Sequence, residues 1–323
     1  MRNREFGRLG WRVSEIGYGA WQIGGTQWGT VTVQRAEAAL RAALEAGIDF
    51  FDTAMAYGNQ RSEQIVGRVL RQENAIGRVR IATKVPPLNR RWPADPRTPL
   101  EEVFPAEHIR ASAEASLRAL GIEPIDLLQL HVWTDAWATD AEWHDALARL
   151  KDEGKIRAFG VSISEYDPDS ALEVTRSGKI DSLQLIYNAL EQAPEARLLP
   201  AARAAGVAVI ARVPLDEGAL AGTLTEQTRF AQDDFRAQFF APAKLPEFVR
   251  RAEGVRPLLE ENGPDMATGA LRFCLSNPDV ATVIVGSTNP EHVRRNAAVS
   301  ALGPLPPATL SALRAHAWDR RPK

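Results

Sequence analysis

Cysteine is almost absent from this sequence of 323 residues, and long apolar runs are missing. Cys274 is the single thiol, so an intrachain disulfide is excluded and a reducing compartment is indicated. Because Cys274 lies in a helical pattern over Ala270–Leu275, we expect it to be a buried structural thiol. The first residues are polar and charged, unlike a signal peptide, and no stretch approaches the ~20 apolar residues that cross a bilayer. We expect a soluble cytoplasmic protein without a membrane partner.

An excess of charge of either sign is also missing. The chain has 39 Lys and Arg against 41 Asp and Glu, which gives a formal net charge of -2. Basic runs with interleaved aromatics do not occur, so no nucleic-acid partner is expected. The five histidines are scattered, without a His-x-His or His-Glu-x-x-His spacing, so the sequence predicts no metal site.

A glycine-rich dinucleotide fingerprint is the third absence. The nearest match, Gly17–Gln22, has Gln22 where a third glycine belongs, which argues against a doubly wound open sheet. The chain instead contains eight short apolar runs, each followed by an amphipathic helical pattern. The runs are nearly continuous in hydrophobicity, as buried parallel strands are. The predicted strands are Glu15–Gly19, Ile48–Asp52, Val79–Lys84, Ile125–His131, Ile156–Ser162, Ile180–Tyr187, Val207–Arg212 and Thr282–Gly286.

Eight such units predict an α/β fold, a single (β/α)8 TIM barrel domain over residues 1–323. Phe6–Gly10 and Arg12–Ser14 flank a glycine turn and predict an N-terminal β-hairpin. Two long loops, Pro86–Pro105 and Pro214–Pro246, follow the third and seventh strands, on the face where long loops shape a pocket or form a lid. The predicted helices are Val33–Ala46, Ser62–Gln72, Ala106–Leu120, Ala141–Glu153, Ser170–Ser177, Pro194–Ala205, Pro246–Glu261, Pro264–Leu275, Pro290–Ser300 and Pro307–Trp318.

Reactive side chains follow the second, third and fourth predicted strands. Asp52 ends the second strand, and Tyr57 follows it on a turn. Lys84 ends the third strand and His131 ends the fourth. Each also has a structural explanation: a helix cap, a rim aromatic, a lysine that reaches solvent or a packing histidine. Four such groups at one end of adjacent strands are hard to explain as packing, and that end is where α/β barrels keep their chemistry.

Together these four side chains have the properties needed to reduce a carbonyl. A free tyrosine has a pKa of ~10, and we expect Lys84 to lower the pKa of Tyr57 and make it a usable proton donor. Asp52 would keep Lys84 charged and oriented, while His131 would hydrogen-bond the carbonyl oxygen. Side chains supply no hydride, so this chemistry requires a nicotinamide or a flavin.

Polar residues after strands five to eight are candidates to hold that cofactor. Ser162 ends the fifth strand and Gln184 lies in the sixth, and both have the size to hold a carboxamide. Arg212 ends the seventh strand. Ser287–Asn289 follow the eighth strand, where barrels commonly bind phosphate at a helix N-terminus. The same residues would also serve as a plain N-cap before Pro290.

Longer stretches of the sequence form a combined signature: Gly47–Gly58, Ala82–Lys84, Ser112–His131, Gly154–Ser162, Gln184–Asn188 and Gly286–Asn296. With them the chain resembles the aldo-keto reductases along almost its whole length. The resemblance implies a barrel that binds NADP(H), less often NAD(H), across the strand ends and acts on a small carbonyl or alcohol substrate. It also implies a catalytic tetrad, with Tyr57 as the acid and base, formed by Asp52, Tyr57, Lys84 and His131.

The same resemblance assigns the cofactor contacts. Ser162 and Gln184 match the residues that hold the carboxamide, and Ser287 and Asn296 match positions near the 2'-phosphate and the adenine. Further expected contacts are Gly19, Ala20, Trp21, Arg212, Val213, Leu215, Gly286, Thr288 and His292.

The chain departs from the family pattern at two positions. Ile163 stands where an asparagine usually follows the carboxamide serine, so one amide contact is missing. Arg212 stands where many members stack an aromatic ring on the nicotinamide, and its guanidinium can stack too or reach the pyrophosphate. With the following residues 213–218, Arg212 resembles a bacterial subgroup of the family.

Two other hypotheses stay open. In the first, the barrel is a cofactor-holding regulatory or sensor subunit with weak or no turnover; the missing asparagine favours it and the intact tetrad opposes it. In the second, Gly160–Ser164 nearly forms the nucleophile elbow of a serine hydrolase, with Ser164 where a glycine is needed. The sequence leaves the substrate, the direction and the oligomeric state open. Five tryptophans lie in or near the loops at the active end and suit an apolar or sugar-like substrate: Trp21, Trp28, Trp92, Trp133 and Trp137.

Overall fold

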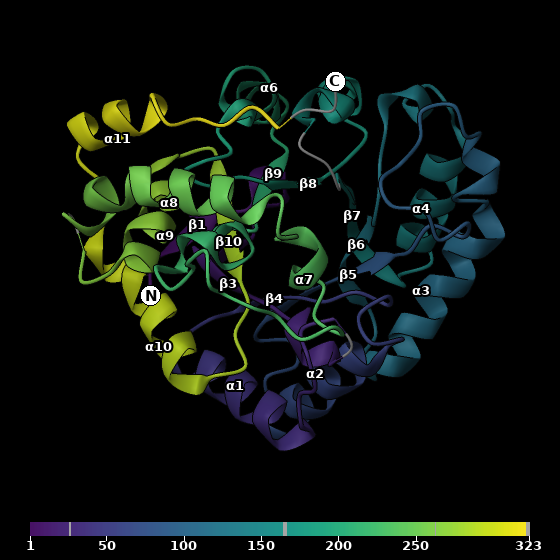
Figure 1. Ribbon diagram of the computed structural model, residues 1–323. Coiled ribbons are helices and arrows are strands. Elements are labelled where there is room, and N and C mark those ends of the chain that lie inside the picture. Colours follow the sequence, from purple (N-terminus) through teal and green to yellow (C-terminus); the bar gives the residue numbers. More distant parts are fainter. Residues whose placement is uncertain (26, 164–166, 262, 321–323) are drawn as a thin grey trace.

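Eight parallel strands form a closed barrel at the centre of the molecule (Figure 1). The computed structural model describes residues 1–25, 27–163, 167–261 and 263–320. Consecutive strands are neighbours and the last pairs with the first, so the predicted α/β barrel is confirmed. The strands are β3 (Ile16–Gly19), β4 (Phe50–Asp52), β5 (Arg80–Val85), β6 (Ile125–Leu130), β7 (Ile156–Ser162), β8 (Ser182–Ile186), β9 (Ala208–Arg212) and β10 (Val280–Val285).

Helices surround the barrel because each parallel strand needs a crossover to return the chain to the same end (Figure 1). Within the described residues, no helix is long and apolar enough to cross a membrane. The last helix ends at Arg314 and not at the predicted Trp318. The residues after Arg314 depart from the helix axis, and the Trp318 amide donates to the Leu190 carbonyl at 2.7 Å. The helices are α1 (Val33–Glu45), α2 (Arg61–Gln72), α3 (Ala106–Leu120), α4 (Glu142–Asp152), α5 (Leu172–Ser177), α6 (Leu198–Ala205), α7 (Arg236–Phe239), α8 (Leu245–Glu260), α9 (Met266–Ser276), α10 (Pro290–Ala298) and α11 (Pro307–Arg314).

The N-terminal hairpin exists, but its first strand is not the predicted one. β1 (Asn3–Glu5) pairs antiparallel with β2 (Arg12–Ser14), while Gly7–Leu9 form a 3-10 turn. The assignment of residues 6–10 to a strand is therefore wrong. The physical reason is that Phe6 turns its side chain into the amino-terminal end of the barrel, where its ring centroid lies 5.4 Å from that of Phe50.

The interior of the barrel changes from apolar to polar along the strands. The layer nearest the amino-terminal ends of the strands packs on Phe6 and contains Phe50, Ala82, Leu127, Ala158 and Ile210. Side chains two positions apart on a strand point the same way. The inward positions two residues further along are therefore those of Asp52, Lys84, Gln129 and Arg212.

The contact between α2 and α3 requires a glycine and supplies a first prediction. A methyl group at Gly67 would overlap the backbone carbonyl of Leu120. Despite the better helix propensity of alanine, we expect Gly67→Ala to lower the free energy of unfolding by about 1–3 kcal/mol. Urea denaturation measures this. Gly254→Ala is the matched control within α8, where the nearest side-chain atom would lie 3.3 Å away, and an equal loss in both variants would contradict the steric explanation.

Candidate active site

A buried ion pair lies at the centre of the candidate site. Lys84 Nζ donates to Asp52 Oδ1 at 2.5 Å and to the Thr53 carbonyl at 2.8 Å. The two charged side chains are 0% and 2% exposed. Gln184 Nε2 donates to Asp52 Oδ2 at 2.7 Å, and Gln129 Nε2 lies 3.5 Å from the same oxygen. A charge pair removed from water in this way is retained only where such extra hydrogen bonds satisfy it.

Tyr57 and His131 lie beside this pair, so the structure brings all four predicted catalytic residues together. Lys84 Nζ is 5.1 Å from the centroid of the Tyr57 ring. The Tyr57 and His131 rings meet edge to face with 5.6 Å between centroids. The turn that carries Tyr57 is fixed by the close approach of Gly24, where an added methyl carbon would lie 2.8 Å from the Tyr57 carbonyl carbon.

The electrostatics of Tyr57 differ from expectation in one respect. Burial raises the pKa of the Tyr57 phenol, and this effect exceeds the lowering by Lys84 and Arg212. Lys84 therefore acts in the expected direction, but the net shift of the Tyr57 pKa is upward. Burial also lowers the pKa of His131 well below 6.5, so its imidazole is neutral near pH 7. Tyr57 is thus protonated and lies beside a neutral imidazole.

The two residues predicted to hold the carboxamide, Ser162 and Gln184, lie on the neighbouring strands β7 and β8. Ser162 is buried and pairs in register with Gln184. Because the amide of Gln184 already donates to Asp52, it links the predicted cofactor side to the ion pair. Arg212 Nη2 donates to the Ile163 carbonyl at 2.9 Å, so its guanidinium spans from the end of β9 to the end of β7.

The loop after β9 has an unusual backbone. Val213, Asp216 and Glu217 have φ angles of 56°, 47° and 57°, a left-handed conformation that is strained for a β-branched valine. Leu215 lies within this stretch. Burial raises the pKa of Glu217 to about 7. Such strain persists only where surrounding contacts fix the loop.

The predicted phosphate loop follows β10. Asn289 caps α10 through its side chain, which accepts from the Glu291 amide at 2.9 Å, so the plain N-cap alternative holds. Gly286 approaches β3 closely: a methyl carbon there would lie 2.8 Å from the Gly19 carbonyl oxygen, next to buried Ala20. Ser287 and Asn296 are largely buried, whereas Thr288 is half-buried and His292 is exposed.

The five tryptophans divide into two groups. Trp21 lies 6.1 Å from Tyr57 between ring centroids, and Trp92 lies 5.8 Å from His131. Trp28 packs behind Trp21 at 5.5 Å. Trp133 and Trp137 are buried against each other and against Trp143 and Phe104, so they belong to the core.

Sequence reasoning missed two residues of the site. Gln129 pairs in register with Lys84 and approaches Asp52. It lies two residues before His131 in the same predicted strand, so its side chain points to the same side, and this spacing could have identified it. Phe235, whose ring lies 4.7 Å from Trp21, comes from the long loop after β9, and no local signal brings the two together.

The nucleophile-elbow hypothesis receives no support from the described residues. Ser162 ends β7 within the strand rather than on a strand-to-helix turn. Ser164, the other serine of that pattern, lies outside the described residues.

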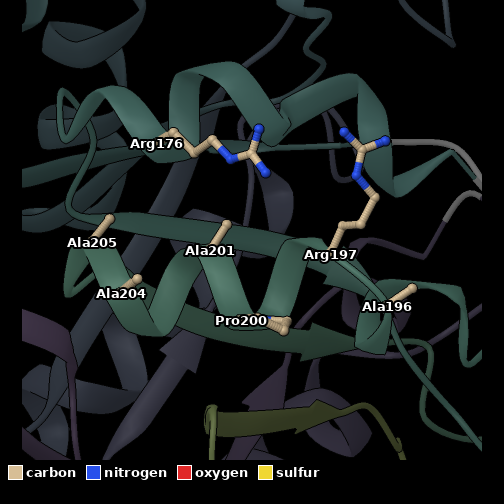
Figure 2. A pocket seen from close by; sticks show the side chains of 7 residues that line it. All are labelled: Arg176, Ala196, Arg197, Pro200, Ala201, Ala204 and Ala205. Carbon is tan, nitrogen blue, oxygen red and sulfur yellow. The ribbon is translucent and has the colours of Figure 1, made fainter.

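A separate hollow of about 480 Å³ lies on the outside of the barrel along α6. Figure 2 shows the residues that line it: four alanines, Pro200 and Arg197 from residues 196–205, and Arg176 from the adjacent helix α5. Arg197 pairs with Asp169 at 3.1 Å. The hollow includes none of the predicted site residues, and it is therefore distinct from the candidate active site.

Comparisons with known proteins show which proteins the chain is similar to in sequence and in fold. The model of the aldo/keto reductase family matches residues 15–317. The chain is 31% identical over 287 residues to aldo-keto reductase YhdN of Bacillus subtilis (strain 168), which covers 87% of this chain and 83% of the relative. It is 30% identical over 308 residues to the NADH-specific methylglyoxal reductase of Escherichia coli (strain K12), and the match covers 92% of this chain and 93% of the relative.

Among solved structures, aldo-keto reductase AKR11C1 from Bacillus halodurans (holo form) superimposes with a TM-score of 0.77 at 26% identity. The superposition covers 100% of this chain and 98% of that one. The sequence match, the barrel and the full-length structural similarity point to the same family. The chain therefore belongs to the aldo/keto reductase family, a family of nicotinamide-dependent oxidoreductases that act on carbonyl compounds and alcohols.

Proposed function

We propose that the protein is an NADP(H)-dependent oxidoreductase that interconverts an aldehyde or ketone and the corresponding alcohol, with Tyr57 as the proton donor in reduction. The observation that carries the proposal is the buried Lys84–Asp52 pair next to Tyr57 and His131. An ammonium held within a protein beside a phenol stabilises the phenolate that remains after proton transfer.

Each residue has one role in the reduction. A bound nicotinamide would supply the hydride to the carbonyl carbon. Tyr57 gives its proton to the carbonyl oxygen, and Lys84 stabilises the resulting phenolate. His131, which is neutral because its pKa lies well below 6.5, hydrogen-bonds the carbonyl oxygen and orients it. Asp52 keeps the Lys84 ammonium in place through their 2.5 Å contact.

The residues at the mouth fit a dinucleotide. Ser162 would hold the carboxamide, and Arg212 would replace the usual stacking aromatic, as in the bacterial subgroup that the sequence resembles. The N-terminus of α10 faces the loop after β10, and the partial positive charge of the helix dipole there favours a phosphate. Ser287 and Asn296 would lie near the 2'-phosphate and the adenine.

Arg35 is a further support for NADP(H), and it supplies a second prediction. Its Nε lies 3.2 Å from the Thr288 carbonyl, so an exposed guanidinium stands beside the predicted 2'-phosphate position. We expect Arg35→Ala to weaken NADPH binding about ten-fold, the loss of roughly one charge-assisted hydrogen bond, and to leave NADH binding unchanged. Quenching of tryptophan fluorescence measures both. Arg294→Ala, which removes a surface arginine paired with Glu45, is the control. Equal losses for the two cofactors would contradict a 2'-phosphate contact.

The alternative of a regulatory subunit with weak or no turnover has a separate test. The intact tetrad favours an enzyme, whereas Ile163 in place of an asparagine favours the alternative. We expect the protein to oxidise NADPH in the presence of some members of a panel of simple aldehydes. Tight cofactor binding without turnover across the panel would favour the regulatory role.

A further inference from the structure

The strained loop after β9 is held from outside by the C-terminal tail. The three left-handed residues of this loop lie between residues 213 and 217, next to Arg212 and in the stretch where the family resemblance places the cofactor contacts Val213 and Leu215. Asn188 Nδ2, from the loop after β8, donates to the Val213 carbonyl at 3.0 Å. The carboxylate of Asp216 is fully buried in the same place, 3.4 Å from the same Asn188 nitrogen.

Arg320 supplies the countercharge to that carboxylate. Its Nη1 lies 2.9 Å from Asp216 Oδ1, and its Nε lies 3.5 Å from Glu191 Oε2. The Arg320 side chain is only 8% exposed. Its guanidinium carbon lies 4.8 Å from the centroid of the Trp318 ring and 5.9 Å from that of Phe248, an arrangement that favours a planar cation.

The tail that carries Arg320 is anchored independently. The Trp318 amide donates to the Leu190 carbonyl at 2.7 Å, and Gln192 Nε2 donates to the Leu313 carbonyl at 2.8 Å. Both anchors lie in the loop after β8, which also supplies Asn188. Three segments far apart in sequence therefore meet behind the mouth of the barrel, and only one of them belongs to the predicted cofactor site.

We propose that Arg320 is a positioning residue that holds the loop after β9 in the conformation that binds the dinucleotide. The inference rests on the proposed function. A buried carboxylate that loses its partner must regain water or take up a proton. Regaining water moves the loop, and taking up a proton leaves Asp216 without the ion pair that held the loop in place. Because Arg320 lies outside the tetrad, its loss acts on cofactor binding and leaves the chemical step unchanged.

The test compares Arg320→Met with Arg251→Met. Arg251 stacks on the same Trp318 ring at 5.2 Å, but it pairs with Glu247 on the surface. We expect Arg320→Met to weaken NADPH binding about ten-fold or more, with kcat at saturating NADPH within two-fold of wild type, and Arg251→Met to change neither. In the free protein, hydrogen exchange of residues 213–222 should rise in Arg320→Met alone.

Two further results decide the inference. Arg320→Lys keeps the charge but loses the planar guanidinium, so its NADPH affinity and its loop exchange should lie between those of wild type and Arg320→Met. If Arg320→Met does not fold, Arg320→Lys is compared with wild type instead. A fall in melting temperature with unchanged NADPH affinity and unchanged exchange of the loop would overturn the positioning role. If wild type itself binds no NADPH or NADH, the proposed function fails and this inference fails with it.

Discussion

Replacing Tyr57 with phenylalanine is expected to lower kcat for carbonyl reduction by about 10²–10⁴-fold, the range for loss of a positioned general acid. The ring remains between Trp21 and His131, because only the hydroxyl is removed. NADPH affinity and thermal stability should therefore stay close to wild type. Steady-state kinetics together with fluorescence titration of the cofactor separate loss of chemistry from loss of binding.

Tyr187→Phe is the matched control for this experiment. Tyr187 is a buried tyrosine outside the tetrad, and its hydroxyl donates to Glu195 at 2.6 Å. The same hydroxyl accepts from Asn277 Nδ2 at 3.4 Å. Loss of these two hydrogen bonds should lower the free energy of unfolding by about 1–3 kcal/mol and leave kcat within about two-fold, because neither partner belongs to the tetrad. Wild-type turnover by Tyr57→Phe would remove Tyr57 from the mechanism.

Replacing Lys84 with methionine is expected to have the second-largest effect, on both stability and rate. Removing one partner of a buried ion pair leaves the Asp52 carboxylate uncompensated, which costs about 3–5 kcal/mol of folding free energy. The double variant Lys84→Met/Asp52→Asn should regain much of that stability, because no buried charge remains. It should not regain activity. Chemical denaturation and kcat of the three proteins provide the comparison.

The pH dependence of Lys84→Met has a defined sign. Lys84 lowers the pKa of Tyr57, so its removal raises that pKa further. Reduction needs protonated Tyr57, and its alkaline limb should therefore move to higher pH in the variant. Oxidation of the alcohol needs the phenolate, so its rate near pH 9 should fall more than the rate of reduction. An alkaline limb that stays in place would contradict the assigned interaction between Lys84 and Tyr57.

The placement of the candidate active site in the fold follows from local sequence rules. Continuous apolar runs identify the strands, and the alternation of side chains places Asp52 and Lys84 on the inward face above Phe50 and Ala82. The same rule applied to Gln129 would have added it to the site. The tetrad could therefore be assembled from the sequence, because neighbouring parallel strands bring their ends together.

Features that depend on distant segments could not be predicted in this way. Arg320 and Asp216 are separated by 104 residues, and no pattern in the sequence pairs the two. Trp133 and Trp137 follow β6 much as site residues do, but they belong to the core. The net pKa shift of Tyr57 depends on the balance of burial against charge, and only the folded packing decides that balance.

The position of Phe6 has a consequence for how protons can reach the candidate site from solvent. Phe6 and the layer that packs on it close the amino-terminal end of the barrel. Any proton that passes between bulk solvent and Lys84 or Tyr57 would therefore have to enter from the carboxyl-terminal end. A dinucleotide and a substrate bound at that end would block the access of solvent to the site. A proton given up by Tyr57 would then be replaced from outside only after a ligand departs, so re-protonation would be tied to product release.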